Sequence, residues 1–227
     1  MVLDASSRHH WVIGDVHGCF RSLETLLAVL PVHDHLIFLG DLINRGDGIE
    51  ATMNLVWDLV LAGRATWLRG NHEQDLIDAL QAGGGTDPDQ LQRIDTYRLL
   101  GERLAREWLP RLERLPSVYE ADGWSATHAG FNNEGQPDLS IRHAFWDSYD
   151  GRFGRVVIGH TPRLDVERSD RLVMVDTGAI YGGWLTAFCP ETDALVQVQG
   201  ARLTPPSPQL DRQRPPLALL SGESSAC

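Results

Sequence analysis

The sequence predicts an α/β fold, and two observations support this prediction. Short apolar runs that end in glycine and a polar residue read as buried strands followed by tight turns. These runs are Trp11–Asp15, Leu36–Asp41, Thr66–Asn71, Ser125–Gly130 and Val156–His160. Leucine-rich segments with helical spacing lie between the first three or follow them, namely Phe20–Leu30, Ile49–Leu61 and Glu73–Leu80. Alternation of strands and helices implies a largely parallel sheet with right-handed crossovers.

The rest of the chain predicts further elements around this core. Residues 83–90 are rich in glycine and form a loop or a helix boundary, and Leu91–Leu115 is charged and amphipathic, which indicates one or two surface helices. Six segments have strand character: Ser117–Ala121, Trp124–His128, Val156–Gly159, Leu172–Asp176, Trp184–Phe188 and Ala194–Gln199. Trp184 and Phe188 alternate as core residues do. We expect one domain over residues 1–203 and a poorly ordered Pro- and Ser-rich tail over residues 204–227.

Composition excludes several classes of function. The net charge of −11 argues against binding to nucleic acid, because phosphate backbones are bound by Lys and Arg. Bound divalent cations would supply positive charge locally, so an anionic substrate remains compatible with this charge. The three cysteines have no CxxC spacing and form no even set, which favours a reducing, cytoplasmic location. We find no signal peptide and no apolar run of ~18 residues, and therefore expect no membrane association.

Polar side chains lie where the predicted strands end. They are Asp15, Asp41, Asn71, His128 and His160, and His17 lies two residues beyond Asp15. Ligands of open α/β sheets bind at the carboxyl ends of the strands, so these donors are expected to converge. Six donors exceed the needs of one catalytic metal, whereas two metals ~3.5–4 Å apart account for all of them. Asp41 is central among the strand-end residues, and we expect its carboxylate to bridge the two metals. Oxygen and nitrogen donors without thiolate suit Mn best among the candidates, with Fe and Zn as alternatives.

Each motif taken alone has a simpler interpretation. Asp15-Val-His17 and Gly70-Asn71 also fit ordinary turns, and His160 fits a loop histidine that is satisfied by its neighbours. The joint occurrence of all these residues at strand ends favours the metal site.

Five motifs resemble the signature series of the calcineurin-like metallophosphoesterases. They are Gly14-Asp-Val-His-Gly18, Gly40-Asp-Leu-Ile-Asn-Arg-Gly46, Arg69-Gly-Asn-His-Glu73, His128-Ala-Gly130 and Gly159-His-Thr-Pro162. The likeness is greatest to the phosphoprotein phosphatase branch, with its bacterial and phage members, and it extends over Trp11–Gly200. It implies a four-layer α-β-β-α sandwich with two mixed sheets. It also implies hydrolysis of phosphomonoesters, with a hydroxide between two divalent metals as nucleophile and a phosphorylated protein or small phosphoester as substrate.

The resemblance also implies a role for each matched residue. Asp15 and His17 would bind the first metal, Asp41 would bridge, and Asn71, His128 and His160 would bind the second metal. His72 would protonate the leaving oxygen or steady the attacking hydroxide. Arg45 would bind phosphate oxygens with its planar guanidinium. Arg69 is a candidate for substrate contact, although a role in bracing the strand end fits it better.

The sequence departs from the family pattern at two positions. Position 44 is Asn where the branch has Asp, so Asn44 accepts the hydrogen bond of the catalytic His72 without bringing a negative charge. This departure resembles relatives that split diadenosine tetraphosphate symmetrically, and it keeps such a hydrolase as the alternative function. The second departure is Ser148, which stands where the family has a phosphate-binding Arg. Arg142, Arg152 and Arg155 are candidates to replace it. Ser148 also keeps open a non-catalytic, metal-bound interaction module.

Overall fold

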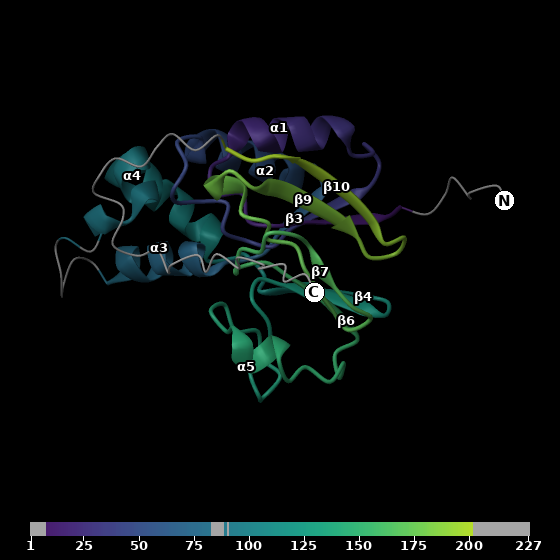
Figure 1. Cartoon of the computed structure of the whole chain (residues 1–227). Coiled ribbons are helices and arrows are strands. Elements are labelled where there is room, and N and C mark those ends of the chain that lie inside the picture. The colour runs from purple at the N-terminus through teal and green to yellow at the C-terminus, as the bar shows by residue number, and fades with distance from the viewer. Residues whose placement is uncertain (1–7, 83–88, 90, 202–227) are drawn as a thin grey trace, which may run out of the picture.

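Two five-stranded sheets lie at the centre of the fold (Figure 1), in a computed structural model that describes residues 8–82, 89 and 91–201. The strands of the first sheet are β10 (Ala194–Gln199), β9 (Trp184–Cys189), β1 (His10–Ile13), β2 (His35–Phe38) and β3 (Ala65–Trp67), in that order. The strands of the second sheet are β4 (Val118–Ala121), β5 (Trp124–Thr127), β6 (Arg155–Ile158), β8 (Leu172–Met174) and β7 (Glu167–Arg168). Only the two-residue strand β7 has no counterpart in the sequence-based prediction.

Both sheets are mixed. Strands β1, β2 and β3 run parallel, and the β9–β10 hairpin adds antiparallel strands at the β1 edge. In the second sheet β5, β6 and β8 run parallel, while β4 and β7 are antiparallel edge strands. The parallel strands of each sheet therefore end at one common edge. This topology confirms the predicted α/β class with two mixed sheets.

The helices cover the outer faces of the two sheets. Helices α1 (Phe20–Val29) and α2 (Ile49–Leu61) bury Leu23, Leu26, Met53 and Val56 against the first sheet. The apolar layer between the sheets includes Val12, Ile37, Leu68, Val157 and Phe188, all fully buried. On the far side of the second sheet, Phe145 of the short helix α5 (His143–Trp146) packs with Val156 and Ile158. The fourth layer of the predicted sandwich is thus present but small.

The segment predicted to form one or two surface helices does so, and one face of it packs against the core. It forms a 3₁₀ turn, η1 (Leu91–Arg93), and helix α4 (Asp95–Leu112), which is interrupted at Gly101 where the backbone has φ 74°. Trp108 of α4 is 1% exposed, and its ring lies 6.0 Å from that of Trp57 and 6.3 Å from that of Trp67. This buried face is hard to recognise in the sequence because α4 contains many charged residues. Only the spacing of its apolar residues distinguishes α4 from a fully solvated helix.

Two further predictions differ from the structure or lie beyond it. Trp184 is 42% exposed, in contrast to the buried Phe188, because it begins β9 at the end of the hairpin and pairs with the polar Gln199. Most of the predicted loop 83–90 and the whole predicted tail 204–227 lie outside the described residues. Within the part of the chain that the structure describes, no helix is both long and apolar enough to cross a bilayer.

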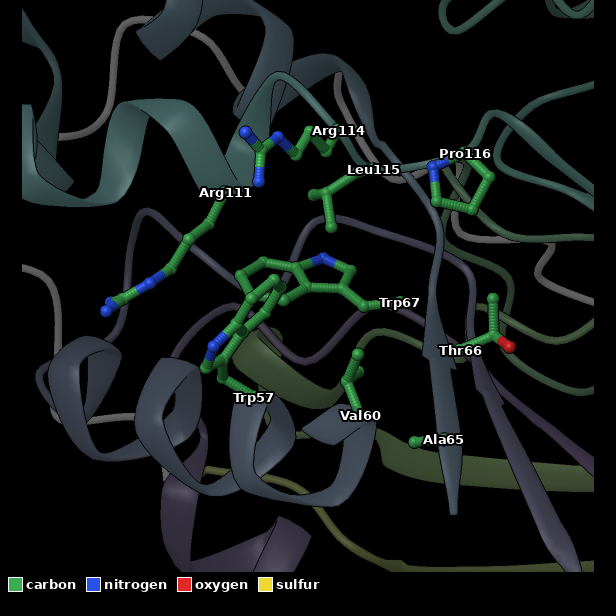
Figure 2. A pocket seen from close by; sticks show the side chains of 9 residues that line it. All are labelled: Trp57, Val60, Ala65, Thr66, Trp67, Arg111, Arg114, Leu115 and Pro116. Carbon is green, nitrogen blue, oxygen red and sulfur yellow. The ribbon is translucent and has the colours of Figure 1, made fainter. Parts of the chain in front are cut away.

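A hollow of about 160 Å³ opens between α2, β3 and the end of α4 (Figure 2). Trp57 and Trp67 form its floor, and the guanidinium of Arg111 lies 5.7 Å from the Trp57 ring. Its lining residues are Trp57, Val60, Ala65, Thr66, Trp67, Arg111, Arg114, Leu115 and Pro116. No carboxylate, histidine or cysteine is among them, so this hollow lacks groups for phosphoester chemistry.

The half-buried histidine His35 predicts a pH dependence of stability. Its Nε2 lies 2.9 Å from Thr66 Oγ1, and burial, with help from Arg8 and His10, lowers its pKa from 6.5 to about 4. Between these values the unfolded chain binds a proton that the folded chain does not, so stability should fall as pH drops from 6.5 to 4. His35→Gln should make this fall shallower. Urea unfolding at several pH values in this window measures it, and identical slopes for both proteins would contradict the assignment.

Candidate functional site

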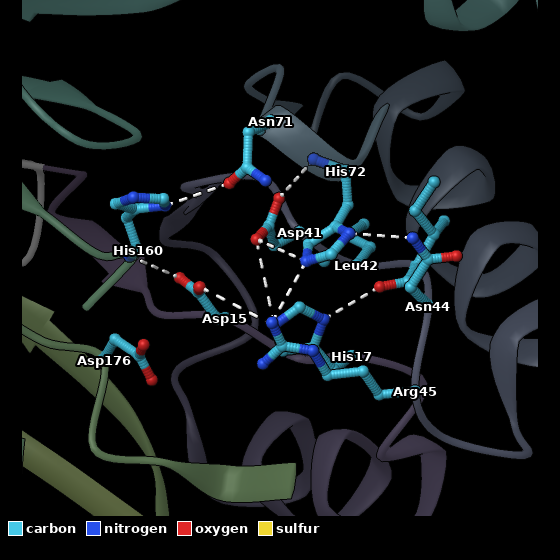
Figure 3. Close-up of polar contacts among 12 residues, drawn as sticks. Asp15, His17, Asp41, Leu42, Asn44, Arg45, Asn71, His72, His160 and Asp176 are labelled. Atoms are coloured by element: carbon cyan, nitrogen blue, oxygen red, sulfur yellow. Dashed lines mark hydrogen bonds and ion pairs between the residues drawn. The ribbon is translucent and has the colours of Figure 1, made fainter. Parts of the chain in front are cut away.

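The predicted site residues meet at the carboxyl edge of both sheets (Figure 3). Loops after β1, β2 and β3 bring in residues from the first sheet, and loops after β5 and β6 bring in residues from the second. Helix α3 (Asn71–Gln81) begins at the site, so Asn71 and His72 occupy its first turn. All six predicted metal-ligand residues lie at this edge, as expected for strands that end side by side.

Asp41 lies at the centre of the cluster. Its Oδ2 atom is 3.8 Å from His17 Nε2, 3.6 Å from His128 Nε2 and 3.8 Å from His72 Nε2. Its other oxygen, Oδ1, accepts a hydrogen bond of 3.0 Å from the backbone N–H of His72. Because that bond fixes the carboxylate plane, Oδ2 is left facing the centre with its lone pairs free.

Two groups of donors flank Asp41. On one side, His17 Nε2 lies 3.9 Å from Asp15 Oδ2, and Asp15 Oδ1 accepts the backbone N–H of His160 at 3.1 Å. On the other side, Asn71 Oδ1 lies 3.0 Å from His128 Nε2 and 2.9 Å from His160 Nδ1. The groups Asp41–His128–His160 and His17–Asp41–His72 each bring their ligand atoms within 4.8 Å of one another. Asp15 joins the latter group through His17.

The donor set fits a bound cation. Neutral His17 and His128 each direct Nδ1 at a backbone carbonyl, of Ile43 at 2.8 Å and of Leu39 at 3.0 Å. These bonds place the ring proton on Nδ1, so the Nε2 lone pairs face carboxylate and amide oxygens that are also acceptors. Acceptors crowded around one buried point repel each other unless a cation lies between them. A divalent metal is therefore the group that these residues are arranged to hold.

The electrostatics of the cluster agree with this interpretation. Burial, Asp176 and Asp41 together raise the pKa of Asp15, and burial and Glu73 raise that of Asp41. Burial, followed by Arg45 and His72, lowers the pKa of His17, so its unprotonated form is favoured. Without a cation, burial and mutual repulsion therefore disfavour the charged forms of these carboxyl groups, and Arg45 and backbone N–H groups offset this effect only in part.

Backbone strain is concentrated in the same loops. Five non-glycine residues of the site have positive φ, and among the described residues the only other one is Asp193 in the β9–β10 turn. The five are His17, Asp41, Asn44, Arg45 and His160, with φ of 47°, 49°, 63°, 73° and 67°. Such strain persists where the surrounding structure holds side chains in a fixed geometry, as at ligand and active sites.

Glu73 braces the loop that carries Asp41. This fully buried carboxylate accepts the backbone N–H groups of Asp41 at 2.8 Å, Leu42 at 3.0 Å and Gly70 at 2.9 Å. Burial raises its pKa to about 7 in spite of these bonds. The sequence carries a signal for this contact, because a glutamate three residues after the N-cap, here Gly70, is typical of helix capping.

His72 is held from behind by Asn44. The Nδ2 atom of Asn44 lies 2.7 Å from His72 Nδ1, and Asn44 Oδ1 faces Thr96, whose backbone N–H donates to it at 3.0 Å. Asn44 therefore donates to His72, whereas the sequence had predicted that it accepts. Thr96 lies in a segment without any motif, and no sequence signal connects it to the site. Burial, followed by Arg45 and His160, lowers the pKa of His72 to about 4.

Arg45 lies at the rim of the site, and its guanidinium is exposed. It donates a hydrogen bond to the hydroxyl of Tyr181, its Cζ lies 5.3 Å from the centre of the Tyr181 ring, and its Nη2 is 3.2 Å from His72 Nε2. Tyr181, at the end of the 3₁₀ turn η2 (Ala179–Tyr181), was missed by the sequence analysis, because it has no motif of its own. Arg45 and Tyr181 together form a positively charged rim beside the metal-ligand cluster.

The other arginines differ in their relation to the site. Arg69 donates to Gln74 Oε1 at 2.9 Å and to the carbonyls of Glu113 and Leu115, which favours the bracing role over contact with substrate. Arg142 donates to Thr161 next to His160, and burial, followed by Arg142, lowers the pKa of His160. Arg152 pairs with Asp150, and Arg155 with Asp193. Of the candidates to replace the Arg absent at Ser148, Arg142 is the one that lies at the site.

Comparisons with known proteins agree on one family. The model of the family described as calcineurin-like phosphoesterase matches residues 9–183. A serine/threonine-protein phosphatase 1 of Salmonella typhimurium is 31% identical over 79% of this chain and 90% of its own length. A symmetrical bis(5'-nucleosyl)-tetraphosphatase of Xanthomonas oryzae is 26% identical over 87% of this chain and 86% of its own.

Solved structures show the same fold. A crystal structure described as a putative diadenosine tetraphosphatase has a TM-score of 0.62 at 19% identity and covers 88% of this chain and 96% of its own. A protein serine/threonine phosphatase from Saccharomyces cerevisiae has a TM-score of 0.56 at 16% identity, with coverage of 89% and 82%.

The incompletely compensated charge of the cluster predicts an unusual effect of Asp15→Asn. In metal-free protein this change removes a buried charge that repels Asp41 and Asp176, so the melting temperature should stay equal or rise. The increase in melting temperature on adding Mn²⁺ should become smaller, because one ligand is weakened. Thermal melts with and without Mn²⁺ test both parts. A lower metal-free melting temperature with an unchanged Mn²⁺ increment would contradict the charge argument.

The brace predicts that Glu73→Ala is severely destabilising. Three buried N–H groups lose their acceptor, and each unsatisfied buried donor costs about 1–3 kcal/mol, so a loss of about 3 kcal/mol or more is expected. Glu73→Gln keeps an acceptor and is the matched control, with a smaller loss. Urea unfolding of the metal-free proteins gives the free energies. Equal stability of Glu73→Ala and the unmodified chain would refute the brace.

Proposed function

The chain belongs to the calcineurin-like phosphoesterase family and is a metal-dependent phosphoester hydrolase, and from this premise we propose a phosphoprotein phosphatase of the serine/threonine type, with activity toward phosphotyrosine as well. The observation that carries the proposal is the position of Asp41 Oδ2, within 3.8 Å of ligand nitrogens on both sides. One oxygen placed between two donor groups is what a bridging carboxylate requires.

The chain's own residues would hold two metal ions. Asp15, His17 and Asp41 would hold one, and Asp41, Asn71, His128 and His160 would hold the other. Two such ions, when bound, lower the pKa of a water molecule and neutralise phosphoryl oxygens. The mixed oxygen and nitrogen donors favour Mn²⁺, with Fe and Zn as the next candidates.

Arg45 and His72 would act on the substrate. The exposed guanidinium of Arg45 reaches into solvent at the rim, and its planar donors match two oxygens of a phosphate group. His72 Nε2 lies between Arg45 Nη2 at 3.2 Å and Asp41 Oδ2 at 3.8 Å, so a phosphate held by Arg45 would lie within reach of the imidazole. Hydrogen bonds to oxygens that gain charge during bond breaking lower the barrier.

Two observations support a protein substrate. The Salmonella relative named as a serine/threonine-protein phosphatase has 31% identity to this chain, which is higher than the 26% of the first tetraphosphatase. In addition, Arg45 and the 49%-exposed Tyr181 form a rim that a phosphorylated side chain on another protein can reach.

A symmetrical dinucleoside tetraphosphatase is the second candidate. It is favoured by the Xanthomonas relatives of that name and by Asn44, which brings no negative charge to His72. A nucleoside diphosphate leaves through a phosphate with a second pKa of ~6 and needs little help from an acid.

A substrate panel tests the proposed function. The metal-free protein, reconstituted with Mn²⁺, Fe²⁺ or Zn²⁺, is assayed on phosphoserine and phosphotyrosine peptides and on diadenosine tetraphosphate. Release of inorganic phosphate from the peptides supports the first candidate. Two molecules of ADP and no peptide cleavage support the second, and no turnover with any metal indicates a non-catalytic module instead.

Replacement of His72 tests its role as a group that acts on substrate without binding metal. His72→Asn should keep two metal ions per chain, because His72 is not among the proposed ligands, but the amide of Asn reaches only as far as the Nδ1 position and leaves no donor at Nε2. Activity should fall by about 10²–10³-fold, as for the loss of one donor to a developing oxyanion. Elemental analysis and phosphate release measure the two effects. A fall in metal content would show that His72 is a ligand.

A further inference from the structure

Thr96 determines which way the side-chain amide of Asn44 is turned. The backbone N–H of Thr96 donates to Asn44 Oδ1 at 3.0 Å, and the Thr96 hydroxyl donates to the same oxygen at 2.6 Å. That hydroxyl in turn accepts the backbone N–H of Asn44 at 2.9 Å. A backbone N–H can only donate, so the atom that faces it must be the amide oxygen. The rotated amide would place two donors against each other in a fully buried environment, which is costly.

The orientation of Asn44 decides where His72 carries its proton. With Oδ1 held by Thr96, the NH₂ group of Asn44 points at His72 Nδ1 from 2.7 Å and donates to it. A ring nitrogen that accepts a hydrogen bond carries no proton, so the single proton of neutral His72 lies on Nε2. His17 and His128 show the opposite tautomer, because their Nδ1 atoms face carbonyl oxygens.

The acceptor that the Nε2–H group of His72 faces in the site, Asp41 Oδ2, lies 3.8 Å away, which is beyond hydrogen-bond distance. Arg45 Nη2 lies 3.2 Å from Nε2, so two N–H donors lie next to each other. Donors that converge repel each other unless an oxygen accepts from both. The edge of a phosphate group that carries the leaving oxygen is such an acceptor.

We propose that Asn44 and Thr96 are positioning residues that keep the His72 proton on Nε2, so that His72 donates a hydrogen bond to the leaving oxygen without transferring the proton. The enzyme thereby favours substrates whose leaving group departs as a stable anion, namely aryl phosphates such as phosphotyrosine and phosphoanhydrides, over alkyl phosphates such as phosphoserine. This inference rests on the proposed phosphoester hydrolysis and ranks the substrates of the two candidate functions: phosphotyrosine and dinucleoside tetraphosphates would be cleaved faster than phosphoserine, which would remain a slower substrate.

The proposed step balances without a proton from His72. The oxygen of water forms a bond to phosphorus while the bond from phosphorus to the leaving oxygen breaks, and that electron pair stays on the leaving oxygen. The water gives its proton to solvent, and the leaving group takes one from solvent after departure. A phenolate with a pKa of ~10 or a phosphate with a pKa of ~6 can leave this way, whereas a serine alkoxide is far more basic.

Nitrogen NMR of the full chain tests the position of the proton directly. With ¹⁵N-labelled histidine, the long-range spectrum of the metal-free and of the diamagnetic Zn²⁺-loaded protein should show His72 protonated on Nε2. Asn44→Asp replaces the donor by an acceptor and should move the proton to Nδ1. Thr96→Val and Thr96→Ser both keep the backbone N–H that holds Asn44 Oδ1, so both should keep the His72 proton on Nε2. Protonation on Nδ1 in the unmodified protein would overturn the proposal.

Kinetics separate hydrogen-bond donation from acid catalysis. Glutamine places its amide nitrogen near the Nε2 position but cannot give up a proton, so His72→Gln should retain turnover of an aryl phosphate within about tenfold, against about 10²–10³-fold loss in His72→Asn. Asn44→Asp should raise kcat on an alkyl phosphate relative to the aryl one by about tenfold or more, because acid catalysis contributes 10²–10⁴-fold where it operates. Equal losses in His72→Gln and His72→Asn, or an unchanged ratio in Asn44→Asp, would overturn the proposal.

Failure of the inference and failure of the proposed function give different results. If the Mn²⁺-loaded protein hydrolyses no phosphoester, the proposed function is wrong while the NMR measurement still locates the proton. If hydrolysis proceeds but His72 is protonated on Nδ1, only the inference fails.

Discussion

The structure of the site depends on one buried carboxylate that faces lone pairs from two sheets. Asp41 is 2% exposed, and its free oxygen faces the Nε2 lone pairs of His17 at 3.8 Å and of His128 at 3.6 Å. Such an arrangement is unfavourable in a protein interior unless a cation joins it, because buried charges need partners. The surrounding network, with Glu73 under the loop and backbone N–H groups on the outer carboxylate oxygens, holds the repelling groups in place. Folding thus brings together acceptor atoms that repel one another, and a bound metal ion would remove this repulsion.

The two-sheet architecture explains how residues that are distant in sequence reach one point. The loops that carry Asp15, Asp41 and Asn71 follow three neighbouring parallel strands of the first sheet, and those that carry His128 and His160 follow two neighbouring parallel strands of the second. Glycines allow the loops to approach closely, since a Cβ at Gly159 or Gly70 would collide with an oxygen of Asp15 or Asp41. The positive φ values of the site residues are the conformational cost of this convergence.

Hydrogen-bond direction distinguishes the histidines of the site from one another. His17 and His128 turn Nδ1–H toward backbone carbonyls and offer Nε2 to a metal, whereas His72 meets a donor at Nδ1. In the proposed function, the same side-chain type would thus serve as a metal ligand in one position and as a donor toward substrate in another. The difference comes from what lies behind the ring, a carbonyl in two cases and an amide locked by Thr96 in the third. Under the proposed mechanism, substrate preference would depend on Thr96, a residue outside the proposed metal-binding and substrate-binding groups.

The α/β class, the motif positions and the candidate ligands could be predicted from the sequence, because strand periodicity, glycine turns and the spacing of Asp, Asn and His are local properties. The sequence also indicated that position 44 departs from the family pattern. The direction of the Asn44–His72 bond became clear from the folded chain, since it depends on Thr96, which lies 52 residues away and has no motif. The bracing contacts of Arg69, the nearness of Tyr181 to Arg45 and the burial of the Trp108 face likewise depend on long-range packing. Which group donates a hydrogen bond and which residue is buried depend on neighbours in space, and these neighbours cannot be identified from a pattern along the chain.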